Sequence, residues 1–207
     1  MHPAIGVLLA YIAGSIPFAL LAGRARGLDL RQHGSGNLGA TNAVRVLGPV
    51  PGGLVYVADT LKGLLPVLLL PGVTNTGHAE LWAIAYGVAS ILGHVFPVFL
   101  LGKGGGKGVA TAGGVFFALA WVAALTALVV FVVALAATRI VSVASIAASL
   151  ALPLAVLVWR GATDPLFPVS LVIGLLVILA HRANFARLRR GEEPRIGAGS
   201  GKRAGVT

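Results

Sequence analysis

Residues 109–138 read VATAGGVFFALAWVAALTALVVFVVALAAT and contain no charged side chain. As one straight helix rising 1.5 Å per residue, this stretch would be about 45 Å long, whereas the hydrocarbon core of a bilayer is about 30 Å thick. One helix would also put Arg139, which follows the stretch, across the membrane from Lys103 and Lys107, which precede it. We therefore predict a hairpin of two short membrane-spanning helices that turns near residues 120–124.

The rest of the chain is similarly apolar. Of its 207 residues, 57% are hydrophobic and 11% are charged, compared with about 25% charged residues in soluble domains. We predict an all-α integral membrane protein of seven transmembrane helices, with a membrane domain over residues 1–195 and a disordered basic tail over residues 196–207. Besides the hairpin, the predicted spans are residues 3–23, 51–70, 81–101, 143–159 and 165–180.

The basic residues fall on one side of this topology. The net charge is +10, and 14 of the 16 Lys and Arg residues lie in four segments; the other two are Arg160, in a short loop, and Lys62, within a span. Because loops rich in Lys and Arg stay in the cytoplasm, we place the N-terminus outside and the C-terminus inside. The run at 3–23 has no basic region before it, so we interpret it as a retained span rather than a signal peptide. The four basic segments are residues 24–45, 103–107, 139 and 182–203.

Composition also excludes several kinds of chemistry. There is no cysteine, which excludes disulfides, zinc ribbons and thiol catalysis. No two of the six carboxylates fall in inner-facing membrane segments, which argues against a two-metal site. A soluble nucleic-acid-binding protein would not be this apolar, whatever its charge. We expect no metal, no cofactor and no nucleic-acid partner.

The first polar block on the inner side is GSGNLGATNAVRVLG, residues 34–48. Its glycines allow the backbone to come close to an anion. Arg45 adds a forked cation that suits phosphate. The alternative interpretation is a flexible connecting loop, but the density of small polar groups between two spans favours a phosphate site.

The second block is GKGGGKGVAT, residues 102–111, and it opens a predicted helix. The N–H groups and the dipole at a helix start favour an anion. The nucleotide-binding P-loop requires Ser or Thr after its lysine, whereas Gly108 follows Lys107, so nucleotide hydrolysis is not indicated. Anchoring of the cytoplasmic side explains the lysines alone, but not three successive glycines.

Two further blocks lie at the inner ends of the last spans. Ser142 and Ser145 follow Arg139 and are three residues apart, on one helix face; serines in membrane helices also often bond their own backbone. The fourth block is HRANFARLRRGEEPR, residues 181–195, in which His181 and Asn184 share a face if the helix continues. Its arginines also suit a basic anchor at an anionic leaflet.

Two polar features lie within the spans. Asp59 and Lys62 are three residues apart and can pair, which limits the cost of burying their charges. We interpret them as a structural pair. His94 stands near the inner end of its span, before a proline, and we interpret it as a hydrogen-bonding residue at a helix end.

These blocks, in this order, resemble the bacterial acyl-phosphate:glycerol-3-phosphate acyltransferase family (PlsY). The resemblance covers almost the whole chain up to residue 193. In this sequence the run Gly104-Gly105-Gly106 is one glycine longer than the family pattern, which leaves open whether Lys103 or Lys107 makes the main phosphate contact. The matching segments are GSGNLGATNAVRVLG at 34–48, DTLKG at 59–63, GHVFPVF at 93–99, GGKGVAT at 105–111, RIVSVASI at 139–146 and HRANFARLRRGEE at 181–193.

The resemblance implies transfer of an acyl group from acyl phosphate to the 1-hydroxyl of sn-glycerol 3-phosphate. The products are 1-acyl-glycerol 3-phosphate (lysophosphatidic acid) and phosphate, in the first step of phospholipid synthesis. Neither acyl-CoA nor acyl carrier protein is the donor, and the residues agree, because no histidine is followed five positions later by the aspartate of common glycerolipid acyltransferases. The expected location is a bacterial inner membrane, as a monomer among membrane lipids with its site facing the cytoplasm.

The resemblance also implies roles for the residues of the blocks. Acyl phosphate is already activated, so the enzyme has mainly to align two anionic substrates and neutralise their charge. The proton of the 1-hydroxyl goes to His181 or to a substrate phosphate oxygen, two alternatives that stay open. The expected catalytic residues are His181, Asn184, Ser142, Arg45 and Lys107. The expected substrate-binding residues are Ser35, Asn37, Gly39, Thr41, Asn42, Lys103, Gly105, Gly106 and Arg139.

Two other classes of protein compete with this interpretation. Basic glycine loops also suit a membrane transporter of a small phosphorylated metabolite, but transporters usually show internal repeats and helices interrupted near the midplane. We find no repeat, and the polar blocks lie at one end of the spans. A lipid-binding scaffold would not need such ordered polar blocks.

Overall fold

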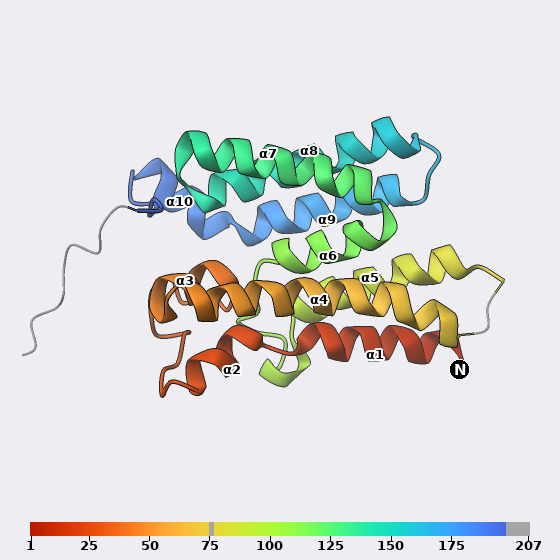
Figure 1. The fold of residues 1–207 in the computed structure, drawn as a ribbon, viewed down its shortest axis with the longest axis horizontal. Helices are drawn as coiled ribbons and strands as arrows, with labels where there is room; N and C mark the ends of the chain where they lie inside the picture. The colour runs from red at the N-terminus through yellow and green to blue at the C-terminus, as the bar shows by residue number, and fades with distance from the viewer. Residues whose placement is uncertain (75–76, 198–207) are drawn as a thin grey trace, which may run out of the picture.

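The computed structural model describes residues 1–74 and 77–197, and within these ranges it contains helices and no strand. The long helices lie side by side along the longest axis of the molecule (Figure 1). This confirms the predicted all-α fold for the described residues. The elements are α1 (Pro3–Ser15), α2 (Phe18–Arg24), α3 (Ala40–Leu47), α4 (Pro49–Val73), α5 (Ala79–Val95), the 3₁₀ turn η1 (Val98–Leu100), α6 (Val109–Leu119), α7 (Trp121–Thr138), α8 (Val141–Arg160), α9 (Leu166–Ala180) and α10 (Arg182–Arg189).

Five segments in the described part of the chain are long and apolar enough to cross a membrane. A sixth is available if α9 and α10, which meet at a bend of 52°, form one broken span. Helix α6 has 11 residues, about 16 Å at 1.5 Å per residue, and is too short to cross alone. The five segments are Pro3–Arg24, Pro49–Val73, Ala79–Leu100, Trp121–Thr138 and Val141–Arg160.

The uncharged stretch 109–138 folds as a hairpin, as predicted. A single residue, Ala120, in a non-helical conformation separates α6 from α7. Helix α7 then returns alongside α8 (Figure 1). In this view the first turn of α6 lies closer to the N-terminal end of the bundle than the first turn of α4 does (Figure 1). The glycine loop before α6 therefore enters the bundle.

The predicted end of the second span at residue 70 is wrong, because α4 continues through Pro71 and Gly72 to Val73. A proline removes one hydrogen bond from a helix but does not end it when the neighbouring groups are satisfied. Here the last turn is closed by Thr74, whose backbone N–H and hydroxyl both donate to the Leu70 carbonyl, at 3.0 and 2.9 Å. The short loop therefore begins at Thr74.

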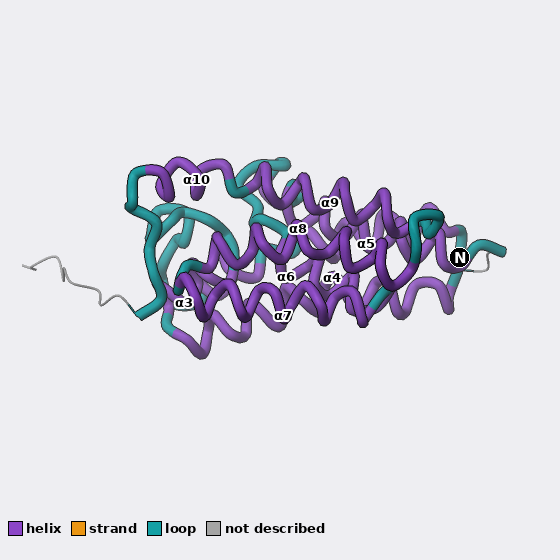
Figure 2. Tube along the Cα trace, turned by 90° about the horizontal axis from the view of Figure 1, so that it is seen from above, coloured by secondary structure: helices purple, strands orange, loops and turns teal. Residues whose placement is uncertain are grey.

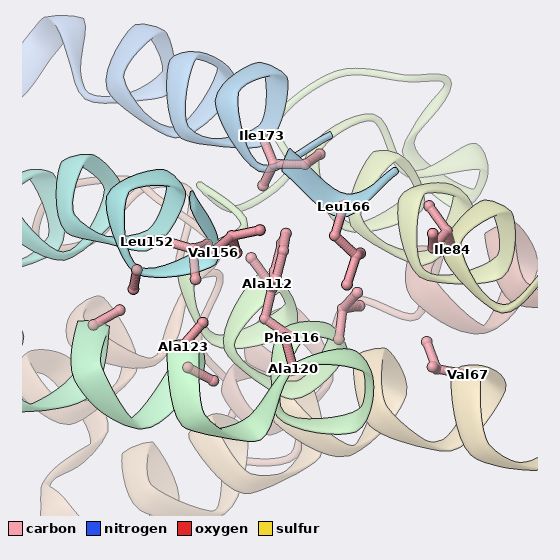
Figure 3. Packing of buried hydrophobic residues seen from close by; sticks show 14 of the residues in the cluster. Val67, Ile84, Ala112, Phe116, Ala120, Ala123, Leu152, Val156, Leu166 and Ile173 are labelled. Atoms are coloured by element: carbon pink, nitrogen blue, oxygen red, sulfur yellow. The ribbon is translucent and has the colours of Figure 1, made fainter. Parts of the chain in front are cut away.

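Glycines bring the helix backbones into contact. A Cβ on Gly114 of α6 would lie 2.1 Å from the Thr60 carbonyl oxygen of α4, and a Cβ on Gly63 of α4 would lie 2.2 Å from the Thr111 carbonyl oxygen of α6. Only a residue without a side chain fits at such a crossing. Phe116, Val156 and other buried residues of α6 to α9 fill the space beside it (Figure 3).

The two ends of the bundle differ in charge. The loop before α3, the turn between α7 and α8, and the segment around α10 lie at the end opposite the N-terminus (Figures 1 and 2). These are three of the predicted basic segments. At the N-terminal end, Arg160 pairs with Asp164 at 2.7 Å and with Glu80, so its charge is neutralised. These basic segments, which are separate in the sequence, thus lie at the same end of the bundle, opposite the N-terminus.

Candidate active site

A polar pocket of about 170 Å³ lies among the loops opposite the N-terminus. Residues from all four polar blocks line it. Of the fourteen residues predicted from sequence, ten belong to this lining: Ser35, Asn37, Gly39, Thr41, Asn42, Arg45, Lys107, Ser142, His181 and Asn184. The lining further includes Asp59, His94, Ser145, Arg187 and Glu193.

Asn42 shapes the first wall of the pocket. Its side chain is buried, accepts from the Ser35 backbone N–H at 2.8 Å, and donates to the carbonyls of Leu30 and His33 at 3.2 and 3.0 Å. All these bonds hold the loop before α3. Gly34 lies against Asn42 with φ +63°, a conformation that favours glycine. Asn42 therefore builds the binding loop, while Ser35 and Arg45 line the pocket without a hydrogen bond from their side chains to any described group.

Lys107 forms the second wall. Its Nζ donates to the Asn184 side-chain carbonyl, which joins the glycine loop to α10. Burial lowers the pKa of Lys107 to about 8, assisted by the nearby positive charges of Arg187 and Arg45 and opposed by Glu193. A partly buried cation beside other cations is placed to receive an anion. Gly108, at φ +84°, turns the chain from Lys107 into α6.

Glu193 connects the start of α8 with α10, which carry the third and fourth polar blocks and form the remaining walls of the pocket. Its carboxylate accepts from the Ser142 hydroxyl at 2.8 Å, from Asn184 Nδ2 at 2.6 Å and from Arg187 Nε at 2.7 Å. Burial favours the neutral acid, but the hydrogen bonds from Asn184, Arg187 and Ser142 outweigh it and lower the pKa of Glu193. Neither Glu193 nor Arg187 was predicted from the sequence as a site residue. The signal was an acidic pair that follows a run of arginines after one glycine, in a chain with only six carboxylates.

His181 lies at the bend between α9 and α10, buried, and lines the pocket. Its Nδ1 is 2.7 Å from the Val177 carbonyl oxygen, an acceptor, so Nδ1 carries the proton. In the neutral ring, Nε2 is then left with a free lone pair. The geometry suits acceptance of a hydrogen bond from a hydroxyl in the pocket.

Four predicted residues do not line the pocket. Lys103 is exposed, and Gly105 packs so closely on α5 that a Cβ would lie 2.3 Å from the Val95 carbonyl oxygen. Gly106 lies against the His94 ring in the same way. Arg139 caps α7 at φ +59°, and its carbonyl accepts from the Ile196 N–H at 2.7 Å. In this structure Gly105, Gly106 and Arg139 shape and fasten the loops, and Lys107, not Lys103, is the lysine that lines the pocket.

An apolar cavity of about 270 Å³ adjoins the polar pocket. Its walls come from α4 and α6 to α9, and they include Phe116, Leu152 and Ile173. The two spaces share part of their lining: Tyr56, Val109, Ala110, Phe131 and Ser145. A molecule with an anionic head and a hydrocarbon tail has room for one part in each space.

Comparison with known proteins identifies the family. The sequence pattern described as glycerol-3-phosphate acyltransferase matches residues 4–191. The chain belongs to the glycerol-3-phosphate acyltransferase family. Its enzymatic class, which the resemblance of its blocks predicted, is thereby confirmed.

Individual relatives match this acyltransferase over more than nine-tenths of its length. It is 47% identical to the glycerol-3-phosphate acyltransferase of Geobacter sulfurreducens, over 92% of this chain and 95% of that protein. It is 45% identical to the one from Anaeromyxobacter sp. strain K, over 93% and 96%. A crystal structure of PlsY, an integral membrane glycerol 3-phosphate acyltransferase, in its glycerol 3-phosphate form has a TM-score of 0.87 and 42% identity, covering 94% of this chain and 96% of that one. The lysophosphatidic acid form of PlsY gives a TM-score of 0.84 and 40% identity, covering 94% of this chain and 95% of that one.

Proposed function

We propose that this acyltransferase moves an acyl group from acyl phosphate to the 1-hydroxyl of sn-glycerol 3-phosphate, releasing phosphate and 1-acyl-glycerol 3-phosphate. The observation that carries the proposal is the continuity of the cationic pocket with the apolar cavity. Acyl phosphate has an anionic head and an apolar tail, and it fits across both. The PlsY structures with glycerol 3-phosphate and with lysophosphatidic acid support the acceptor and the product.

In this proposal, different walls of the polar pocket bind the phosphate groups of the two substrates. The loop built by Asn42, with Lys107, receives the head of acyl phosphate, and Arg45 receives glycerol 3-phosphate. Ser142, His181 and Asn184 hold the glycerol end near the acyl carbon. The proton of the attacking hydroxyl goes to His181 Nε2 or to a phosphate oxygen. Alignment and charge neutralisation supply the catalysis, because the mixed anhydride is already activated.

The proposal includes the placement of the protein in the cell. We propose seven spans in a bacterial inner membrane, with the pocket on the cytoplasmic side; α7 is one full span, and α6 counts as another together with the glycine loop that precedes it. The gathering of basic loops at the pocket end supports this orientation. We further propose that the monomer is the active unit, since a single chain brings residues of all four polar blocks to the pocket.

The donor is tested with purified protein in detergent. Given long-chain acyl phosphate and glycerol 3-phosphate, it should release inorganic phosphate only when both are present. Acyl-CoA and acyl carrier protein should give no product. Transfer from acyl-CoA would contradict the proposed donor, and liposome uptake of glycerol 3-phosphate without chemistry would support the transporter instead.

The affinity for the phosphate substrates should fall as the pH rises through about 8. The charged form of Lys107 binds phosphate, and its pKa in the ligand-free protein is about 8. Below that pH the cation is present, and above it the cation is lost. We expect kcat/KM to decline above pH 8 and to follow a single ionisation. The remaining activity of Lys107→Gln should not show this decline above pH 8. If the decline persists in Lys107→Gln, it comes from the ionisation of another group.

Filling the apolar cavity should selectively weaken the binding of acyl phosphates with long acyl chains. Ala148 of α8 lines the cavity, and a phenylalanine there occupies space that the chain needs. Excluding about two methylenes, at about 0.8 kcal/mol each, reduces affinity about tenfold. We expect Ala148→Phe to lower kcat/KM about tenfold for a sixteen-carbon acyl phosphate and to spare a four-carbon one. Ala151→Phe, on the same helix outside the cavity lining, is the control; equal losses for both chain lengths would contradict the cavity's role.

A further inference from the structure

Three ionisable side chains are buried together where α4 and α5 pack. Lys62 Nζ lies 2.8 Å from Asp59 Oδ1 and donates to the Ile16 carbonyl, also at 2.8 Å. His94 Nδ1 lies 3.6 Å from the same Asp59 oxygen. All three side chains are at most 7% exposed. Charges inside a membrane span are costly, and they usually face a polar cavity or serve the site beside it.

This cluster extends to the wall of the active site. Asp59 and His94 line the polar pocket, and Lys62 does not. Lys62 therefore lies behind the pocket wall, bonded to the break between α1 and α2, and Asp59 and His94 both lie in the wall itself. Beyond its contact with Lys62, Asp59 Oδ1 makes no hydrogen bond of regular geometry within the described residues. An ion pair used only to join helices would not need a histidine that reaches the pocket.

His94 in turn supports the glycine loop. The Gly106 N–H donates to the His94 carbonyl at 3.1 Å, and a Cβ on Gly106 would lie 2.1 Å from His94 Nε2 and 2.9 Å from the Leu38 carbonyl oxygen. Gly106 is thus held between the imidazole ring and the first polar loop. The next residue is Lys107, whose Nζ reaches Asn184. The position of this ammonium group depends on where Gly106 rests.

We infer that Asp59 and His94 are positioning residues for Lys107. The ion pair with Lys62 fixes the Asp59 carboxylate, and this carboxylate orients the imidazole of His94. The imidazole ring in turn fixes the position of the Gly106 backbone. Lys107 is then held in the pocket, where it receives a substrate phosphate. The inference rests on the proposed function for the identity of that phosphate. It gives a role to two motifs, DTLKG and GHVFPVF, that the proposed mechanism leaves without one.

A double-mutant cycle tests this chain of contacts, because residues that act through one another have effects that do not add. His94→Gln is measured alone and combined with Lys107→Gln. We expect His94→Gln alone to lower kcat/KM for acyl phosphate about tenfold. The loss should come from a higher KM for acyl phosphate, and kcat should stay within about twofold of the native value. In the Lys107→Gln background the same change should cost less than about twofold. Equal factors in both backgrounds would overturn the inference and indicate that His94 contacts the substrate itself.

A second variant makes the test independent of the histidine. Gly106→Ala pushes the loop away from the ring and should give the same rise in KM and the same loss of effect in Lys107→Gln. Gly53→Ala, on an open face of α4 with no atom within 4 Å of the added methyl, should change neither constant. A thermal melt in detergent accompanies each variant, and the cycle with Gly106→Ala decides the question if His94→Gln does not fold.

The failure of the proposed function is distinguishable from failure of this inference. If the native protein transfers no acyl group from acyl phosphate, the proposed function fails. The cycle is then read from the binding of inorganic phosphate by calorimetry, with the same expected non-additivity. If the native protein is active and the cycle is additive, only the positioning role fails.

Discussion

Replacement of Arg45 by alanine is expected to raise the KM for glycerol 3-phosphate about 10- to 100-fold while the fold survives. Arg45 lies in the last turn of α3 and lines the polar pocket, and no described residue forms an ion pair with it. Its guanidinium is therefore free to take a phosphate in a forked pair. Hydrogen bonds to charged groups contribute about 1.5–3 kcal/mol, which corresponds to this range of affinities.

Steady-state kinetics in detergent, with glycerol 3-phosphate varied at saturating acyl phosphate, measure the effect. Arg45→Lys keeps the charge but loses the fork, so its KM should lie between those of the native protein and Arg45→Ala. Arg189→Ala is the matched control, because Arg189 is exposed on α10 and does not line the pocket. An unchanged KM in Arg45→Ala would remove Arg45 from the binding site.

Replacement of Gly114 by leucine should prevent folding of most of the protein. A Cβ at this position would lie 2.1 Å from the Thr60 carbonyl oxygen and 3.0 Å from the Leu64 nitrogen, both in the backbone of α4. Backbone atoms cannot turn aside as a flexible side chain does, so α4 and α6 would have to separate. Overpacking commonly costs about 1–3 kcal/mol, and a separated helix pair also loses the neighbouring contact of Gly63.

The measurement is the fraction of monodisperse protein after size-exclusion chromatography in detergent, together with its melting temperature. Gly113→Leu is the matched control. Gly113 precedes Gly114 on the same helix and is exposed, with no atom within 4 Å of an added Cβ. We expect Gly113→Leu to leave the melting temperature within a few degrees. Normal folding of Gly114→Leu would contradict the close crossing of α4 and α6.

Much of the fold could be predicted because the bilayer limits the alternatives. Helix length, the absence of charge over residues 109–138 and the one-sided basic loops together predicted the hairpin, and the structure places its turn at Ala120. The end of α4 could not be predicted in this way. A proline is an ambiguous signal in a membrane helix, and a bond from Thr74 to a carbonyl decides it.

The pocket was predictable in outline for a different reason. Ten of the predicted residues line it, because glycine-rich and basic blocks are rare in an apolar chain and indicate anion binding wherever they meet. Sequence alone does not separate the residues that face the pocket from those that shape it. Gly105 and Gly106 support the loop through close packing, and Glu193 enters the pocket through bonds that include one to Ser142, 51 positions earlier in the chain.

The central claim is that four cationic segments meet on one side of the membrane, and single-cysteine labelling tests it most directly. The native chain has no cysteine, so Gln32→Cys, Lys103→Cys, Ala137→Cys and Arg189→Cys can each carry one thiol near one segment. A membrane-impermeant maleimide is applied to intact cells and to inside-out vesicles. We expect all four thiols to react only in inside-out vesicles, and Ala162→Cys, at the other end of the bundle, to react only in intact cells. Labelling of any of the four from outside the cell would contradict the shared pocket.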